Sequence, residues 1–334
     1  MSNRIPANWT RALTALVIAA SGLCAQAAPA ADQVNVRYSW KLKGEYMAFY
    51  MAKEKGYFAK EGIDAKLGEG AGAQAALGSL IQGNEDVVVL PGIYAITAIS
   101  KGMPIKMIAL YHPVAPVGFL SNRENPVRTP KDLEGKSVST AAGDTTVEYL
   151  PVLCSKAKID CSKIKRVRGD MGMRVSQLQA KQVDLASTYL NVDPPMLEAQ
   201  NLHFVIFDAA KFGLTVPGLA LVSTDKAIQT KGDVLRRFIR ALNQGFDSSR
   251  SDPTGAAEAL LKSWSGGPPL GVVTEQVKKT LEFTPVATKE PLGHIDPAVI
   301  RSALDEMALV NPQHASAKPL DDYYTNVLLA PAKN

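Results

Sequence analysis

The sequence has no apolar run long enough to cross a bilayer. The longest run, residues 12–23, holds 12 residues, whereas a membrane-spanning helix needs roughly 17 to 25. The chain has 334 residues of which 46% are hydrophobic, so it can bury a sizeable core. Single cores stop growing at about 250 to 300 residues. We therefore expect a water-soluble mature protein built from two compact units.

Enzyme signatures are absent as well. No G-x-S-x-G elbow, Walker loop or H-E-x-x-H motif occurs, and the acidic residues form no obvious general acid/base pair. Residues 68–80, GEGAGAQAALGSL, do contain G-x-G-x-x-A, which begins a dinucleotide-binding fingerprint. This stretch follows the second expected strand, and the nearest downstream acids, Glu85 and Asp86, precede a strand instead of closing one. We expect a protein that is not an enzyme and holds no cofactor.

The N-terminus is typical of an export signal. Two arginines precede the apolar run, and residues 25–27, Ala-Gln-Ala, form an A-x-A site suited to signal peptidase. We expect cleavage near Ala27, removal of residues 1–27, and a periplasmic mature protein. Lipidation at Cys24 is the alternative, but bulky Leu23 stands where a small residue would precede the cysteine.

Metal-site spacing and strong charge are also lacking. The four histidines are scattered, and Cys154 and Cys161 have no paired His or Cys nearby, so we expect no metal site. In an oxidising compartment these two cysteines are expected to form a disulfide, the alternative being two buried thiols. Without Arg4 and Arg11 of the leader the formal charge falls from +5 to +3. This is too little for a nucleic-acid binder.

Strand-like and helical patterns alternate along the chain. VNVRYSW, IDAKL and DVVVL are typical of strands at residues 34–40, 63–67 and 86–90, with helical patterns between them. A second series of the same kind begins at residues 129–133, and a Leu-x5-Asp spacing closes a strand-helix-strand unit in both series. The alternation predicts an α/β fold with largely parallel sheets in two similar lobes, followed by C-terminal helices.

The candidate site residues come from loops that follow the expected strands. In open α/β sheets ligands gather at the carboxyl ends of the strands, so loops of both lobes would line a cleft between them. The candidates for ligand binding are Trp40, Lys41, Lys43, Glu45, Gly70, Ala71, Gly72, Pro91, Gly92, Tyr111, Gly143, Asp144, Thr145, Thr146, Glu148, Tyr189, Asn191 and Asp193.

The first loop combines an indole with two cations. Trp40, Lys41 and Lys43 suit a planar or anionic ligand through stacking and charge. Trp40 is equally typical of a buried core residue, and the lysines of solvated side chains.

Two later loops carry polar candidates. Thr145 and Thr146 open a helix whose free backbone N–H groups could hold an oxyanion. Thr145 and Glu148 also match a capping box, and a glutamate there would weaken anion binding. Asn191 and Asp193 could bond a ligand, although an Asx-Pro sequence is also ordinary turn chemistry.

Longer stretches resemble a known family, the periplasmic substrate-binding proteins of ABC importers for nitrate, sulfonates, taurine and thiamine-pyrimidine precursors. The similarity covers about residues 34–262 and lies in YMAFYMAKEKGYFAKEGID, ALGSLIQGNEDVVV, AISKGMPIKMIALY, TPKDLEGKSVST, QLQAKQVDLAS and VLRRFIRALNQGF. The most specific pieces are KGYFAKEGID, the G-x-x-D before the third strand, and D-L-x-G-K.

The resemblance implies a type II periplasmic-binding fold, in which two α/β lobes are joined by two crossing strands. The crossings are expected near residues 119–124 and 212–217, which places the C-terminal helices back on lobe one. Lobe one would then comprise residues 33–122 and 217–330, and lobe two residues 123–216.

The resemblance also implies a function. Family ligand contacts fall on Trp40 and its loop and on residues 70–72, 91–92 and 143–146. We expect a monomer that binds a small organic anion, a sulfonate or an aromatic carboxylate, and delivers it to an inner-membrane permease. The alternatives are a thiamine-precursor pyrimidine or a nitrate-like ion as ligand, or a sensory receptor or periplasmic enzyme on the same scaffold. The cysteine-rich motif of the related pyrimidine-synthesising enzymes is missing, and residues 41–43 are less polar than the loop of pyrimidine binders.

Overall fold

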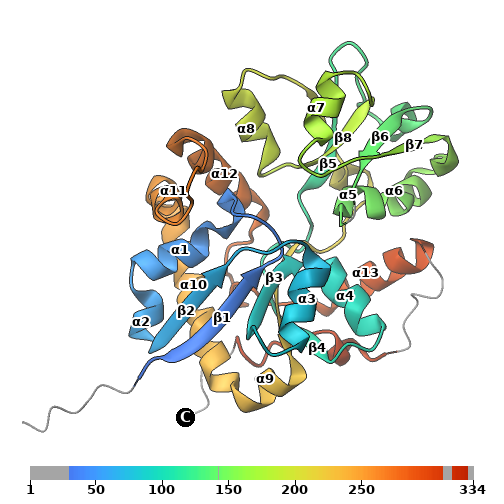
Figure 1. The fold of residues 1–334 in the computed structure, drawn as a ribbon. Coiled ribbons are helices and arrows are strands. Elements are labelled where there is room, and N and C mark those ends of the chain that lie inside the picture. Colours follow the sequence, from blue (N-terminus) through green and yellow to red (C-terminus); the bar gives the residue numbers. More distant parts are fainter. Residues whose placement is uncertain (1–29, 142, 311–317, 330–334) are drawn as a thin grey trace, which may run out of the picture. The chain divides into compact units, whose positions relative to one another are not determined.

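Two five-stranded mixed β-sheets carry the fold (Figure 1). The computed structural model describes residues 30–141, 143–310 and 318–329, so the expected leader and its cleavage site lie outside the described residues. Sheet A has the order β2-β1-β3-β10-β4, and sheet B the order β7-β6-β8-β5-β9. Sheet A consists of β1 (Asp32–Tyr38), β2 (Ile63–Gly68), β3 (Val87–Pro91), β4 (Ile105–Leu110) and β10 (Leu219–Thr224). Sheet B consists of β5 (Val117–Ser121), β6 (Ser137–Thr140), β7 (Lys165–Arg168), β8 (Leu185–Tyr189) and β9 (Val205–Asp208).

Each sheet is parallel except where the chain arrives from the other sheet. β1 pairs in parallel with β2 and β3, whereas β10 runs antiparallel to β3 and β4. In sheet B, β6 pairs in parallel with β7 and β8, whereas β5 runs antiparallel to β8 and β9. The expectation of largely parallel sheets therefore fails at β5 and β10, the first strands after each crossing.

The two crossings lie between β4 and β5 and between β9 and β10. The first, residues 111–116, was expected near 119–124, but residues 117–121 already form β5 in sheet B. A lobe-one boundary at residue 122 is therefore wrong. The second crossing, residues 209–218, contains the expected 212–217. The crossing segments bond to each other, since Ala115 N donates to Val216 O at 2.7 Å and Gly218 N to His112 O at 2.8 Å.

Helices cover both sheets, and we call sheet A with its helices lobe one and sheet B with its helices lobe two. All of these elements belong to the compact unit Asp32–Asn334. Lobe one carries α1 (Met47–Glu54), α2 (Tyr57–Lys60), α3 (Ala73–Ile81), α4 (Gly92–Ser100), α9 (Asp225–Thr230), α10 (Gly232–Ser251), α11 (Pro253–Leu261), α12 (Leu270–Phe283) and α13 (Pro297–Val310). Lobe two carries α5 (Thr145–Glu148), α6 (Leu150–Ala157), α7 (Arg174–Gln179) and α8 (Asp193–Ala199).

Short 3₁₀ helices complete the elements. They span Gly44–Tyr46, Pro130–Leu133, Cys161–Lys163, Ala210–Phe212 and Leu320–Asp322. Cys154 of α6 and Cys161 form a disulfide, with their Cα atoms 5.6 Å apart. In the part of the chain that is described, no helix combines the length and the apolar character needed to cross a membrane.

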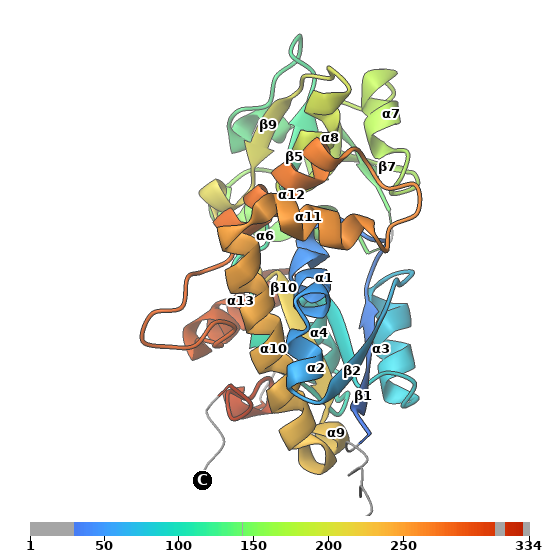
Figure 2. The same ribbon diagram turned by 90° about the vertical axis from the view of Figure 1, so that its left-hand side faces the viewer.

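One buried cluster of lobe one lies between sheet A and helices α1 and α10, and a second, which includes residues of α3 and α4, continues into lobe two. Helix α10 is amphipathic and buries Leu235, Phe238, Ile239, Leu242 and Phe246, at the helical spacing expected from the sequence. It packs against α1, which in turn contacts α11 (Figure 2). The aromatic side chains pack closely, and the Phe238 ring stacks on Phe58 with 5.2 Å between centroids.

Two C-terminal helices contact both lobes, which the sequence did not predict. Helix α12 packs against the lobe-one segment Gly44–Tyr46 and against α8 of lobe two. Helix α13 packs against α4 of lobe one and α6 of lobe two. Helices α12 and α13 therefore belong to lobe one but also contact lobe two.

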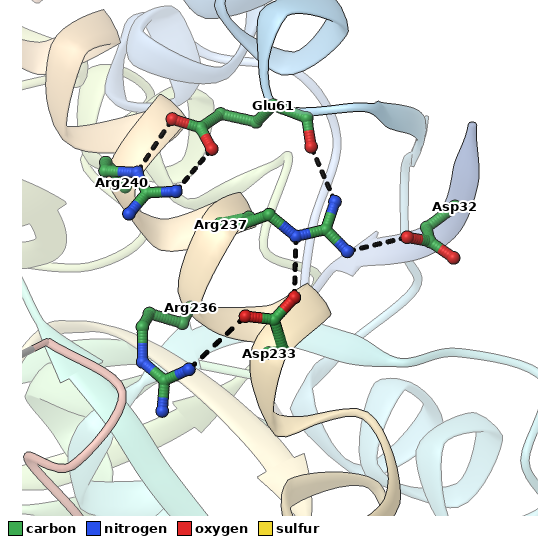
Figure 3. A network of polar contacts seen from close by, with 6 residues as sticks. All are labelled: Asp32, Glu61, Asp233, Arg236, Arg237 and Arg240. Carbon is green, nitrogen blue, oxygen red and sulfur yellow. Dashed lines mark hydrogen bonds and ion pairs between the residues drawn. The ribbon is translucent and has the colours of Figure 1, made fainter. Parts of the chain in front are cut away.

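A polar network fixes the start of β1 on helix α10 (Figure 3). Arg237 donates to Asp32 and to the backbone oxygen of Glu61, at 2.6 Å each. Arg240 binds the Glu61 carboxylate through two nitrogens, at 2.7 and 2.5 Å. Exposed ion pairs stabilise little individually, about 0 to 1 kcal/mol. The main role of the network is therefore to position the start of β1 and the turn before β2 on helix α10.

Candidate functional site

A cavity of about 230 Å³ lies at the carboxyl ends of strands from both sheets. Its volume is below the roughly 300–1,000 Å³ that is typical of ligand cavities. Both lobes and both crossings contribute to the lining, which also includes loops that follow strands. The lining residues are Ser39, Trp40, Lys41, Leu42, Lys43, Glu45, Tyr46, Gly72, Ala73, Leu90, Pro91, Tyr94, Ala115, Pro116, Gly143, Met171, Arg174, Tyr189, Val192, Asp193, Gly218 and Leu219.

Half of the expected site residues are in this lining. They are Trp40, Lys41, Lys43, Glu45, Gly72, Pro91, Gly143, Tyr189 and Asp193. The alternative of Trp40 as a core residue is wrong, because 44% of its surface is exposed. Aromatic surface comes from both lobes, with Trp40, Tyr46 and Tyr94 from lobe one and Tyr189 from lobe two.

Lys43 and Glu45 form a buried ion pair at the cavity wall. Lys43 Nζ lies 2.6 Å from Glu45 Oε2, and their side chains are only 15% and 6% exposed. Burial opposes both charges, but the partners outweigh it, so the pKa of Lys43 is raised and that of Glu45 lowered. Lys43 Nζ also lies 4.7 Å from the ring centre of Tyr189, a cation–π contact between the lobes. The pair is charged at neutral pH.

Helix α12 and the loop after β8 hold this ion pair in place. Asn191 donates through Nδ2 to Glu45 Oε1 at 3.3 Å and to Thr280 Oγ1 of α12 at 3.0 Å. Gln276 accepts from Gly44 N and donates to Val192 O, both at 2.9 Å. Asn191 was expected to contact a ligand, but it is fully buried and serves as this brace.

His112 of the first crossing lies behind the pair. Its ring is fully buried, and Nδ1 is 3.6 Å from Glu45 Oε1, too long for a hydrogen bond. Burial lowers the pKa of His112 to about 4, and nearby Lys43 adds to this effect while Glu45 opposes it. The histidine is therefore neutral at pH 7, and its contact with Glu45 is not an ion pair.

Arg174 and Asp193 form a second ion pair, on the lobe-two wall. Arg174 Nη2 lies 2.5 Å from Asp193 Oδ2, and both side chains are less than one-fifth exposed. Arg174 lies on α7 and was not anticipated, because the loop after β7 was left out of the expected site. The same strand-end rule, applied to the end of β7 at Arg168, would have indicated this loop and its Met171.

The start of helix α5 does not form the expected oxyanion site. Asp144 is the N-cap and accepts from Val147 N at 3.3 Å, while Glu148 accepts from Gly143 N at 2.8 Å. Two backbone donors are thus already bound to carboxylates. The capping box expected from Thr145 to Glu148 is also wrong, because the cap lies one residue earlier.

The threonines of α5 are buried beneath the cavity. The hydroxyls of Thr145 and Tyr189 are 3.1 Å apart. Thr146 is fully buried, and its hydroxyl has no hydrogen-bond partner among the described residues. Glu148 is exposed, and its carboxylate accepts from the hydroxyl of the lining residue Tyr94 at 2.7 Å. Neither threonine nor Asp144 or Glu148 lines the cavity.

The remaining expected residues support the wall from outside or lie apart from it. Gly70 passes so close to β1 that an added Cβ would meet Tyr38 O at 1.9 Å, so only glycine fits. Ala71 is exposed, and Gly92 N donates to Gly218 O at 2.6 Å beneath the second crossing. Tyr111 is buried in the core of lobe one, where its hydroxyl donates to Asn243.

Every cation of the described lining has an acid beside it. Lys43 is paired with Glu45 and Arg174 with Asp193. Lys41 is 70% exposed and lies 3.5 Å from Glu69. Among the described residues, no cluster of His, Cys, Asp or Glu has the arrangement of a metal site. The cavity therefore offers aromatic surface and paired charges.

Comparison with known proteins supports the assignment of fold and family. A family model described as NMT1/THI5 like matches residues 43–256. The chain is 24% identical to the formylaminopyrimidine-binding protein of Halalkalibacterium halodurans, over 70% of this chain and 71% of that protein. It is 22% identical to the riboflavin-binding protein RibY of Chloroflexus aurantiacus, over 71% and 68% of the two chains.

One relative is named as an enzyme. It is the 4-amino-5-hydroxymethyl-2-methylpyrimidine phosphate synthase of Schizosaccharomyces pombe, 20% identical over 66% of this chain and 67% of that protein. Among solved structures, the periplasmic aliphatic sulphonate binding protein SsuA of Escherichia coli superimposes with a TM-score of 0.71 at 16% identity, covering 91% and 95% of the chains. This likeness confirms the predicted periplasmic-binding fold.

Proposed function

Because the chain belongs to the NMT1/THI5-like family, whose model matches residues 43–256, we propose that it is the solute-binding component of an ABC importer. In this role it would bind a small solute between its lobes in the periplasm and present it to a permease. Support comes from the fold shared with a periplasmic binding protein and from relatives named for the solutes they bind.

We further propose that the solute carries a planar aromatic ring. The observation behind this proposal is the lining itself, in which aromatic side chains surround cations that acids already neutralise. A small anion such as a sulfonate or nitrate gains most from an unpaired cation or free backbone N–H groups. Lys43 and Arg174 are paired, and carboxylates occupy two backbone donors at the start of α5. The ring, and not a negative charge, is then the recognised feature.

Two of the named relatives fit this ligand class. Formylaminopyrimidine and riboflavin both contain a nitrogen heterocycle, and each relative matches about two-thirds or more of this chain. The expected organic anion remains compatible where the acid group is attached to a ring, as in an aromatic carboxylate. We propose binding without chemical conversion, because the lining resembles a recognition surface and the sequence carries no catalytic signature.

Binding is proposed to act through a population shift. A solute that touches both lobes only when they approach stabilises the closed form by its differential affinity. The crossings at residues 111–116 and 209–218 are the segments where backbone rotation would move one lobe against the other. The permease would then recognise the closed form.

A calorimetric panel tests the proposal. The mature chain is titrated with 4-amino-2-methylpyrimidine, riboflavin, benzoate, ethanesulfonate and nitrate, and thermal shifts are recorded in parallel. We expect the ring compounds to bind best, with a stabilisation of about 2.7 kcal/mol at 100 times the dissociation constant. Mass spectrometry should recover the solute unchanged. Tighter binding of ethanesulfonate or nitrate than of any ring compound would contradict the aromatic ligand class, and a converted solute would show an enzyme.

A further inference from the structure

The lobe-two ion pair is fixed by the protein in a way that leaves part of it unused. Asp193 Oδ2 accepts from Arg174 Nη2 at 2.5 Å, from Tyr189 N at 2.9 Å and from Thr188 Oγ1 at 3.1 Å. No hydrogen bond within the described residues ends on Asp193 Oδ1. One carboxylate oxygen is thus held by three donors, and the other is an open acceptor on a residue that lines the cavity.

Arg174 is held in the same manner. Its Nε donates to Ser187 O at 2.8 Å, its Nη1 to Met171 O at 2.5 Å, and its Nη2 to Asp193. A guanidinium has five N–H groups, so two remain without a partner in the described part of the chain, one on each Nη. All these contacts lie within lobe two, and the pair is therefore assembled before any solute arrives.

We propose that Arg174 and Asp193 bind one edge of the solute by hydrogen bonds. This edge carries a hydrogen-bond acceptor beside an N–H donor. Asp193 Oδ1 accepts from the donor, and a free N–H of Arg174 donates to the acceptor. Lactam edges (C=O beside N–H) and amino-azine edges (ring nitrogen beside NH₂) have this pattern. The inference rests on the proposed function, because it specifies which aromatic heterocycles the cavity selects.

The pattern also explains what the cavity rejects. Sulfonates and nitrate present acceptors alone, so one of their oxygens would face the Asp193 carboxylate without a proton between them. A site that bonds an N–H group discriminates strongly against an analogue that lacks it, because the site's own polar atom is left unpaired. A purely structural ion pair would show no such discrimination.

Two matched solutes test the inference on the unmodified protein. 4-Amino-2-methylpyrimidine carries the donor, and 4-(dimethylamino)-2-methylpyrimidine keeps the ring but has no N–H. We expect calorimetry to show the amino compound binding at least tenfold more tightly. Equal affinities would overturn the inference while leaving the proposed function standing. Failure of both pyrimidines, of riboflavin and of benzoate to bind would overturn both proposals.

The variant Asp193→Asn supplies the second arm. Asparagine keeps one oxygen for the contacts of Oδ2 and places an NH₂ group where Oδ1 stood. We expect the preference for the amino compound to fall to threefold or less, with the melting temperature confirming a folded chain. Asp208→Asn is the matched control, because Asp208 is a lobe-two carboxylate outside the cavity lining. A full tenfold preference in Asp193→Asn would contradict the inference, and so would a loss of the preference in Asp208→Asn.

Discussion

The two walls of the cavity carry similar residue types but use them differently. On lobe one, Lys43 and Glu45 bond to each other, and Asn191 and helix α12 brace them from behind. On lobe two, Arg174 and Asp193 also bond to each other, but Asp193 keeps one carboxylate oxygen open, whereas both oxygens of Glu45 are bonded. An ion pair in a cavity can thus serve either to hold the wall in place or to recognise a ligand. The exposed Trp40 gives lobe one a stacking surface, so a solute must touch both lobes to gain both kinds of contact.

The largest effect is expected from Glu45→Gln, which leaves Lys43 buried without its counter-charge. Removing one partner of a buried ion pair costs about 3 to 5 kcal/mol, and the side chains here are 15% and 6% exposed. Urea unfolding should show a loss of this size. Lys41→Gln is the control, since that pair is exposed and should change stability by less than about 0.5 kcal/mol. If the unfolding free energy of Glu45→Gln is within about 1 kcal/mol of that of the parent, this pair does not stabilise the wall.

The second effect concerns His112 and acid. Burial lowers its pKa to about 4, below the roughly 6.5 of an unfolded histidine. As the pH falls, the unfolded chain therefore takes up the proton first. The stability that neutral His112 contributes is fully present above about pH 6.5 and is lost as the pH falls toward about 4. A difference of about 2.5 pKa units corresponds to about 3 kcal/mol.

His112→Gln should remove this contribution and flatten the pH dependence of the unfolding free energy between about pH 6.5 and 4. Urea titrations at several pH values measure it, with the exposed His203→Gln as control. If the pH slope is the same in His112→Gln and in the parent, the neutral buried histidine does not control acid stability.

The third effect is on binding alone. Trp40→Ala should weaken the binding of a ring solute by about 1 to 3 kcal/mol, which is the usual contribution of stacking on an aromatic side chain. Stability should change little, because 44% of Trp40 is already exposed. Trp40→Phe keeps a ring and should retain most of the affinity in calorimetry. Unchanged binding in Trp40→Ala would place the solute away from lobe one.

The smallest effect is expected beneath the lobe-two wall. Thr146→Val removes a buried hydroxyl without a partner in the described residues, so stability should rise by up to about 1 kcal/mol. Thr145→Val removes a hydroxyl that pairs with Tyr189 and should lower stability instead. Thermal unfolding distinguishes the two. Loss of solute binding in Thr146→Val would restore this residue to the site, where the sequence had placed it.

The sequence predicts the architecture better than the site. Alternating patterns and strand ends suffice for two α/β lobes and for loops such as residues 40–45, because periodicity and sheet chemistry are local properties. Arg174 was not predicted because the loop after β7 was not among the expected site loops, and its role depends on Asp193, which is 19 residues away. Tyr111 and Asn191 lie in loops that the sequence predicted, but their side chains pack into the protein interior. No local pattern fixes that choice.

The most direct measurement is a crystal structure of the mature chain with the best-binding ring solute. The ring should lie against Trp40, and its polar edge within hydrogen-bond distance of Asp193 Oδ1 and an Arg174 nitrogen. A solute that rests on one lobe only, or whose edge points away from Asp193, would contradict the division of labour between the two walls.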